Sequence, residues 1–266
     1  MLKDITLGQY YQTNSIIHKL DPRVKLMGTL VYIIALFLGQ SMVMYAVAGA
    51  FLVTLIAISK VPVKFMLKGL KPVIFLLIFS AVFNLFLTEG EPLVEWGWFK
   101  ITWEGVRQAV YMVVRLIFLI IGSSILTLTT TPNSLTDGLE KGLGFLKVFK
   151  VPVHEVAMMM SIALRFIPIL TEETDKIMKA QTARGADFET GGVLKRSKAM
   201  VPLLVPLFVS AFRRANDLAM AMEARCYHGS EGRTKFKPLI YKKADYIGYL
   251  VLAAFLAVMI TLKVLL

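Results

Sequence analysis

A series of apolar runs of near-membrane length constrains the fold of this chain most strongly. Apolar residues make up 56% of the 266 residues, and they concentrate in five runs, at residues 26–39, 42–59, 72–87, 106–129 and 246–266. A helix needs about 20 mainly apolar residues to cross a bilayer, and an isolated strand cannot satisfy its backbone there. The sequence therefore predicts an all-α integral membrane protein with about five transmembrane helices, although two of the runs are short.

The loop charges indicate how this protein is oriented. The net charge is +12, and Lys60, Lys64, Lys68 and Lys71 follow one another without an acidic residue between them. Such loops are typical of the cytoplasmic side. The same spacing would place the lysines on one face of a helix lying on anionic lipid, with specific ligand binding as the alternative. We therefore expect a multi-pass protein of the cytoplasmic membrane with its N-terminus inside.

Residues 88–104 are expected to form an external loop. They carry four glutamates, one lysine and three tryptophans, and interfacial tryptophans favour the headgroup level of a bilayer. The alternation around Trp96 and Trp98 suggests a small hairpin. In the apolar run that follows, Arg115 is costly unless it is paired or reaches water. We expect Arg115 to face protein or water, and a role in substrate or proton handling is the less favoured alternative.

The chain changes character between residues 130 and 243, which hold 18 Lys/Arg and 11 Asp/Glu. This predicts three regions: 1–129 with four transmembrane helices, 130–243 with amphipathic helices at or beyond the cytoplasmic membrane surface, and 244–266 with a last transmembrane helix. Two long helices are expected in the middle region, one from Pro152 to Arg184 and one from Met200 to a stop at Gly229. We expect them to pack as a hairpin joined around residues 191–192.

Each of these two helices ends in a similar short motif. We call Ala183-Arg184-Gly185 the first arginine motif and Ala224-Arg225-Cys226 the second; they lie 41 residues apart. Arginine pairs with a carboxylate through two parallel hydrogen bonds, and small neighbours let a helix end enter a groove. The matched pair favours docking into two acidic pockets. Ordinary cations that complement a helix C-terminus are the alternative for either arginine alone.

Motifs of catalysis and metal binding are absent from the sequence. It contains no G-x-x-x-x-G-K-[ST], no H-E-x-x-H and no G-x-S-x-G, and its one cysteine and three histidines form no metal-ligand spacing. The basic residues are spread over several loops and form no nucleic-acid motif. We expect no catalytic residue, no metal, no cofactor and no nucleic-acid partner, so the chain is predicted not to be an enzyme.

Four methionines at two places form a second candidate contact surface. Methionine packs adaptably, and surfaces that accept several partners often use it, although core packing explains such residues equally well. These methionines are Met158, Met159, Met160 and Met220.

The sequence resembles the transmembrane T component of energy-coupling factor (ECF) transporters, EcfT, over nearly the whole chain. The resemblance rests on the two arginine motifs, the lysine loop, the Asp21-Pro22-Arg23 stretch and the segment 165–168. It implies a non-catalytic subunit with coupling helices that joins two ABC ATPases, identical or different, to one membrane substrate-binding S component. Several S components would be interchangeable, and vitamins or transition-metal ions would be imported.

The same resemblance assigns roles to the motifs. Arg184 would contact one ATPase and Arg225 the other, while ATP hydrolysis would belong to these partners. The methionines would meet the S component, and the bilayer would surround the chain. Cys226 departs from the family pattern, which has glycine there. Two alternatives stay open: a conventional ABC permease subunit, for which two motifs in one chain would be unusual, and a secondary transporter, for which intramembrane acidic residues and inverted repeats would be expected.

Overall fold

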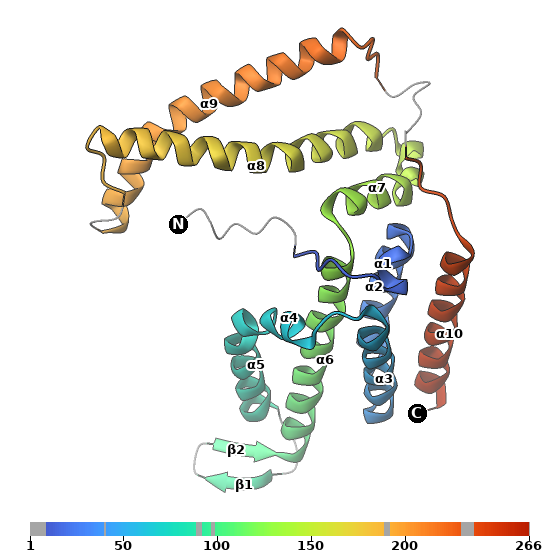
Figure 1. Ribbon diagram of the computed structural model, residues 1–266. Helices are drawn as coiled ribbons and strands as arrows, with labels where there is room; N and C mark the ends of the chain where they lie inside the picture. The colour runs from blue at the N-terminus through green and yellow to red at the C-terminus, as the bar shows by residue number, and fades with distance from the viewer. Residues whose placement is uncertain are drawn as a thin grey trace. The chain divides into compact units, whose positions relative to one another are not determined.

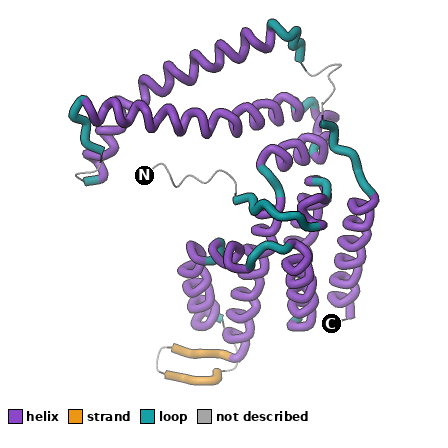
Figure 2. Tube along the Cα trace, viewed as in Figure 1, coloured by secondary structure: helices purple, strands orange, loops and turns teal. Residues whose placement is uncertain are grey.

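The structure, a computed structural model, describes residues 9–39, 41–88, 92–96, 99–188, 192–229 and 237–265. It is helical apart from one small β-hairpin (Figures 1 and 2). Helices α1 to α7 and α10 form one compact unit with the hairpin, and η3, α8 and α9 form a second unit. The elements of the first unit are α1 (Ile16–Lys19), α2 (Pro22–Leu38), α3 (Met42–Ser59), α4 (Val63–Lys68), η2 (Lys71–Val73), α5 (Ile74–Leu87), β1 (Pro92–Trp96), β2 (Phe99–Thr102), α6 (Trp103–Thr129), α7 (Pro132–Gly142) and α10 (Lys243–Leu265); those of the second are η3 (Gly144–Phe149), α8 (Val153–Ala183) and α9 (Val193–Glu223).

Within the described residues, five helical segments are long and apolar enough to cross a membrane: Met42–Ser59, Val63–Leu87, Trp103–Thr129, Val153–Ala183 and Lys243–Leu265. This set includes α8, because the first half of this helix is apolar. From the sequence we expected α8 to leave the bilayer. It does not include α2, which has only 17 residues. However, α2 contacts α3, α6 and α10, so it belongs to the same helical bundle as three of the spans.

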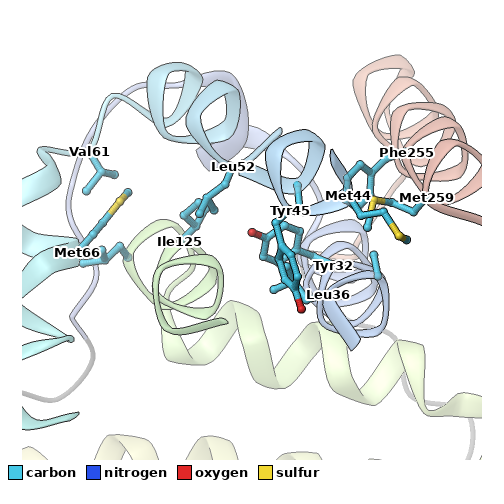
Figure 3. Packing of buried hydrophobic residues seen from close by; sticks show 13 residues of the cluster. Tyr32, Leu36, Met44, Tyr45, Leu52, Val61, Met66, Ile125, Phe255 and Met259 are labelled. Carbon is cyan, nitrogen blue, oxygen red and sulfur yellow. The ribbon is translucent and has the colours of Figure 1, made fainter. Parts of the chain in front are cut away.

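The core of the first unit lies where α2, α3, α6 and α10 meet (Figure 3). Tyr32 of α2 packs beside Phe51 of α3 and Phe255 of α10, whose own rings stack with centroids 4.2 Å apart. Gly122 of α6 makes room for this packing, since a Cβ there would lie 2.5 Å from the Tyr32 ring. The fully buried members of the core are Ala35, Leu36, Met44, Ala48, Met66 and Met259.

The Asp-Pro stretch begins a helix. Asp21 is the N-cap of α2: its carboxylate accepts a hydrogen bond from the Arg23 backbone N–H, and Pro22 occupies the first turn. The Arg23 guanidinium donates to both carboxylate oxygens of Asp21 and lies 3.7 Å over the Tyr241 ring. Burial alone would raise the pKa of Asp21, but hydrogen bonds from the side chain and backbone of Arg23 hold it below its ordinary value.

A single buried carboxylate joins the starts of α2 and α10. Asp245 is 2% exposed. One of its oxygens accepts from the Lys242 backbone N–H at 2.7 Å, which caps α10, and the other accepts from the Asp21 backbone N–H at 2.8 Å. Sequence reasoning missed Asp245, because the basic stretch before it reads as a linker. The sequence signal that could have identified Asp245 as a capping residue is an acidic side chain in the first turn of the last helix.

Arg115 of α6 faces protein, as expected. Its guanidinium donates to the Tyr45 hydroxyl at 2.8 Å and to the Gly39 carbonyl at 3.1 Å. Tyr45 also donates to the Gly39 carbonyl. These bonds pair two N–H groups of the guanidinium and the Gly39 carbonyl at the C-cap of α2, which helps to explain how a cation is tolerated inside a mainly apolar helix.

The lysine loop and the hairpin are also found. All four lysines are exposed, and α4, which carries two of them, turns Met66 into the core while Val63, Phe65 and Leu67 stay exposed. Strands β1 and β2 pair antiparallel, which confirms the expected hairpin. Its turn residues, Gly97 and Trp98, and residues 89–91 of the acidic loop lie outside the described residues.

Candidate docking site at two helix ends

The two long helices of the second unit are equal in length, 31 residues each, and lie in contact. An ion pair links them: Arg214 of α9 donates to the Glu173 carboxylate at 3.2 Å. The end of α8 lies near the start of α9, and α9 then runs across α8 and away from it (Figure 1). The two helix ends that carry the arginine motifs therefore lie at opposite sides of this crossed pair.

The first arginine motif closes α8 with a left-handed turn. Gly185 has a φ of +89°, which glycine adopts without steric cost. Its N–H donates to the Thr182 carbonyl at 2.9 Å, and the Ala186 N–H donates to the Gln181 carbonyl at 3.0 Å. This is the Schellman arrangement, and it leaves Arg184 as the last residue before the turn.

The second arginine motif repeats this geometry 41 residues later. The Cys226 N–H donates to the Glu223 carbonyl at 2.9 Å, and the Tyr227 N–H donates to the Met222 carbonyl at 3.0 Å. Cys226 takes the left-handed position with a φ of +57°. Our expectation that Gly229 ends this helix was wrong, because the turn comes at Cys226, three residues earlier, where the backbone bonds of the cap are made.

Both arginines are free to contact a partner. Arg184 and Arg225 are exposed, and within the described part of the chain neither guanidinium makes a hydrogen bond or an ion pair. Ala183 and Ala224 beside them are exposed as well. Each helix end thus presents one guanidinium framed by small residues, on a backbone turn fixed by two hydrogen bonds. This arrangement can place two cations in defined positions against carboxylates.

Replacing Cys226 by glycine should stabilise the end of α9. A side chain in the left-handed region costs roughly 1 kcal/mol relative to glycine. Hydrogen exchange of the Tyr227 amide should therefore slow by about fivefold in Cys226→Gly. Ala224→Gly is the matched control, because Ala224 has helical dihedrals. In this variant the Tyr227 amide should exchange faster than in the wild type. Equal exchange in Cys226→Gly and the wild type would contradict the strain at this position.

The predicted methionine surface is partly exposed. Met159, Met160 and Met220 are exposed, whereas Met158 is half-buried and has contacts of its own. Sequence reasoning missed a larger apolar surface on α9. Its members recur at helical spacing on one face and are each more than half exposed: Val201, Val205, Phe208 and Phe212. We call these four residues the α9 apolar face.

Comparison with known proteins agrees with these features. The family model described as "Cobalt transport protein" (CbiQ) matches residues 13–236. The energy-coupling factor transporter transmembrane protein EcfT of Ruminiclostridium cellulolyticum is 51% identical over 247 residues, which cover 93% of this chain and 92% of that protein. This chain belongs to the EcfT family. The EcfT of Bacillus subtilis is 47% identical over 260 residues, covering 96% and 98%, and that of Acidaminococcus fermentans is 48% identical over 263 residues, covering 99% and 98%.

Membership of the EcfT family makes the chain a multi-pass transmembrane component of an energy-coupling factor transporter. The relatives are named as transporter transmembrane proteins, which points to a non-catalytic subunit. The family match supports the resemblance drawn from the arginine motifs and the Asp21-Pro22-Arg23 stretch.

Proposed function

We propose that this chain couples two ABC ATPases to a membrane substrate-binding S component, with Arg184 docked on one ATPase and Arg225 on the other. The observation that carries this proposal is the pair of matched helix ends. Both show the same left-handed turn and the same two backbone hydrogen bonds, and both present a guanidinium that pairs with none of the described residues. Two equivalent ends on one chain suit a pair of equivalent sites on an ATPase dimer, whether its subunits are identical or different.

The chemistry of the docking contact follows from arginine itself. Its planar guanidinium forms two parallel hydrogen bonds with a carboxylate, and this pairing gains strength when water is excluded. The flanking alanines and the glycine or cysteine of the turn allow close approach of the helix end. Each ATPase should therefore offer a carboxylate at the base of a groove wide enough for a helix terminus.

Motion is transmitted through the crossed helices in this proposal. ATP hydrolysis belongs to the partners, because the chain carries no nucleotide-binding motif. Closure of the ATPase pair changes the separation of Arg184 and Arg225. Since α8 and α9 contact each other and share the Arg214–Glu173 ion pair, a displacement of one helix end moves the other helix. The movement would reach the membrane and tilt the S component, releasing substrate inward.

The S component is assigned to the apolar surfaces of the second unit. Exposed apolar area on one helix face marks a contact with protein or lipid. The α9 apolar face offers such a surface, and Met159 and Met160 on α8 with Met220 on α9 add adaptable contacts. With these surfaces, one chain can serve several S components in turn. We propose vitamins or transition-metal ions as the cargo, and we propose that the N-terminus and the arginine-bearing ends of α8 and α9 lie on the cytoplasmic side.

Affinity purification of the tagged chain from native membranes tests this function. We expect two ABC ATPase subunits in equal amounts and one small hydrophobic protein for each chain. Several different small proteins across the preparation would show that S components are shared. Recovery of the chain alone would contradict the proposal and favour a secondary transporter, while recovery of ATPases with no additional membrane protein would favour a conventional permease subunit.

A further inference from the structure

An apolar cavity lies inside the first unit between α1, α2, α3, α6 and α10. Its volume is about 260 Å³, and Lys25 is its one charged lining residue. The cavity opens to the exterior, since its lining residues Ile16 and Ile247 are each more than 60% exposed. Glycines bring its walls together: a Cβ on Gly28 would touch Leu252 of α10, and one on Gly248 would touch Val24 of α2.

Three lysines lie on the helices that line this cavity. Lys25 reaches the end of α6, where its ammonium donates to the Thr129 and His18 carbonyls. Lys19 lies three residues after Ile16 on α1, and Lys243 lies four residues before Ile247 on α10, so each shares a helix face with a rim residue. Both lysines are exposed. Two exposed lysines, with no partner among the described residues, therefore lie one helical turn from the apolar opening.

The acidic groups near this rim do not cancel its charge. Asp21 is paired with the Arg23 guanidinium at 2.9 Å. Asp245 is buried, and its two oxygens accept hydrogen bonds from backbone N–H groups of Asp21 and Lys242. Neither carboxylate pairs with Lys19 or Lys243 in the described part of the chain. An anionic group at the rim would thus meet a positive surface.

One polar group inside the cavity has no partner. Tyr32 lines the cavity and is 3% exposed, and its hydroxyl makes no hydrogen bond to the described residues. Leaving a buried hydroxyl unpaired is unfavourable, so native proteins usually satisfy it. A ligand that carries oxygen acceptors on an otherwise apolar body would supply the missing partner.

From these observations we propose that the cavity binds an anionic phospholipid, with an acyl chain between α2 and α10 and the phosphate at Lys19 and Lys243. The apolar lining suits the acyl chain, the rim cations suit the phosphate, and a glycerol ester oxygen suits the Tyr32 hydroxyl. The helices that form the cavity include three segments long enough to cross a membrane, so a lipid from the bilayer could reach the cavity. This site is independent of the arginine motifs and of the ATPase contacts proposed for them.

Photocrosslinking in nanodiscs tests the site on the full chain. The discs contain phosphatidylcholine with a small fraction of phosphatidylglycerol that carries a diazirine on one acyl chain, and labelled peptides are mapped by mass spectrometry. We expect labelling to concentrate in α2 and α10 around the cavity. A phosphatidylcholine probe of the same chain length should label these peptides at least fivefold less.

Two variants and two controls separate the site from the general lipid contact. Ala244→Trp fills the exposed mouth, and Lys19→Glu with Lys243→Glu reverses the rim charge; each should reduce labelling at least fivefold. Ala254→Trp and Lys263→Glu, on the same helix but outside the cavity lining, should leave it unchanged. Even labelling along all lipid-facing helices, equal labelling by both probes, or full labelling in the double lysine variant would overturn the proposal.

Discussion

Reversing the charge of both motif arginines, Arg184→Glu with Arg225→Glu, should abolish co-purification of the ATPases and transport by the assembled complex. A desolvated arginine–carboxylate pair costs about 2–5 kcal/mol when one partner is lost, and reversal adds repulsion. Each single variant should therefore weaken ATPase binding by about 30-fold or more. Binding is measured by titrating purified ATPases against the solubilised chain, and transport by uptake in cells that depend on it.

Arg213→Glu is the matched control for this experiment, because Arg213 is an exposed arginine on α9 outside both motifs. It should bind the ATPases normally. Lysine at position 184 or 225 keeps the charge but loses the bidentate fork, so it should bind with intermediate affinity. Unchanged assembly and uptake in the double reversal would show that the two arginines are ordinary cations at helix ends, and the docking proposal would fail.

Removing the Asp245 carboxylate should destabilise the first unit by about 2–4 kcal/mol. Asp245→Ala leaves the buried Asp21 N–H without its acceptor and removes the cap of α10, and each loss costs about 1–2 kcal/mol. We therefore expect a clear fall in the midpoint of thermal unfolding of the detergent-solubilised chain. Release of the α10 start should also make this helix more accessible to proteolysis at the Lys242 and Lys243 peptide bonds.

Two further variants qualify this result. Asp245→Asn keeps one carbonyl oxygen as an acceptor but loses the charge. Its midpoint of thermal unfolding should therefore lie between those of the alanine variant and the wild type. Asp217→Ala removes an exposed carboxylate from α9 and should shift the midpoint little. A wild-type midpoint for Asp245→Ala would mean that the link between α2 and α10 does not contribute to stability.

Local sequence patterns were sufficient for the features that depend on local chemistry. The start of α2 follows from Asp21 and Pro22, because a capping carboxylate and a fixed φ act within one turn. Arg115 was correctly expected to face protein, because the cost of an unpaired cation in an apolar helix requires a partner. The motif at Arg184 was visible because glycine after the last turn of a helix favours a left-handed cap.

Other features could not be read from the sequence. The stop of α9 at Cys226 instead of Gly229 depends on backbone hydrogen bonds that override the residue preference. The role of Asp245 depends on a contact with Asp21, 224 positions away in the chain. The exposure of the α9 apolar face could not be predicted for a similar reason, since an apolar stretch has the same sequence whether or not other helices cover it in the fold.

By itself, the sequence determined that the chain is a helical membrane protein with two repeated arginine-bearing helix ends, because hydrophobic length and residue spacing act along the chain. Only the tertiary structure decided that both ends adopt the same turn, that Asp245 joins α2 to α10, and that α2, α6 and α10 enclose an apolar cavity with a basic rim. These depend on close approach between distant segments, made possible by small residues such as Gly122 and Gly248. The sequence specifies the size of each residue, but tertiary packing determines which side chain fills the space beside a small residue.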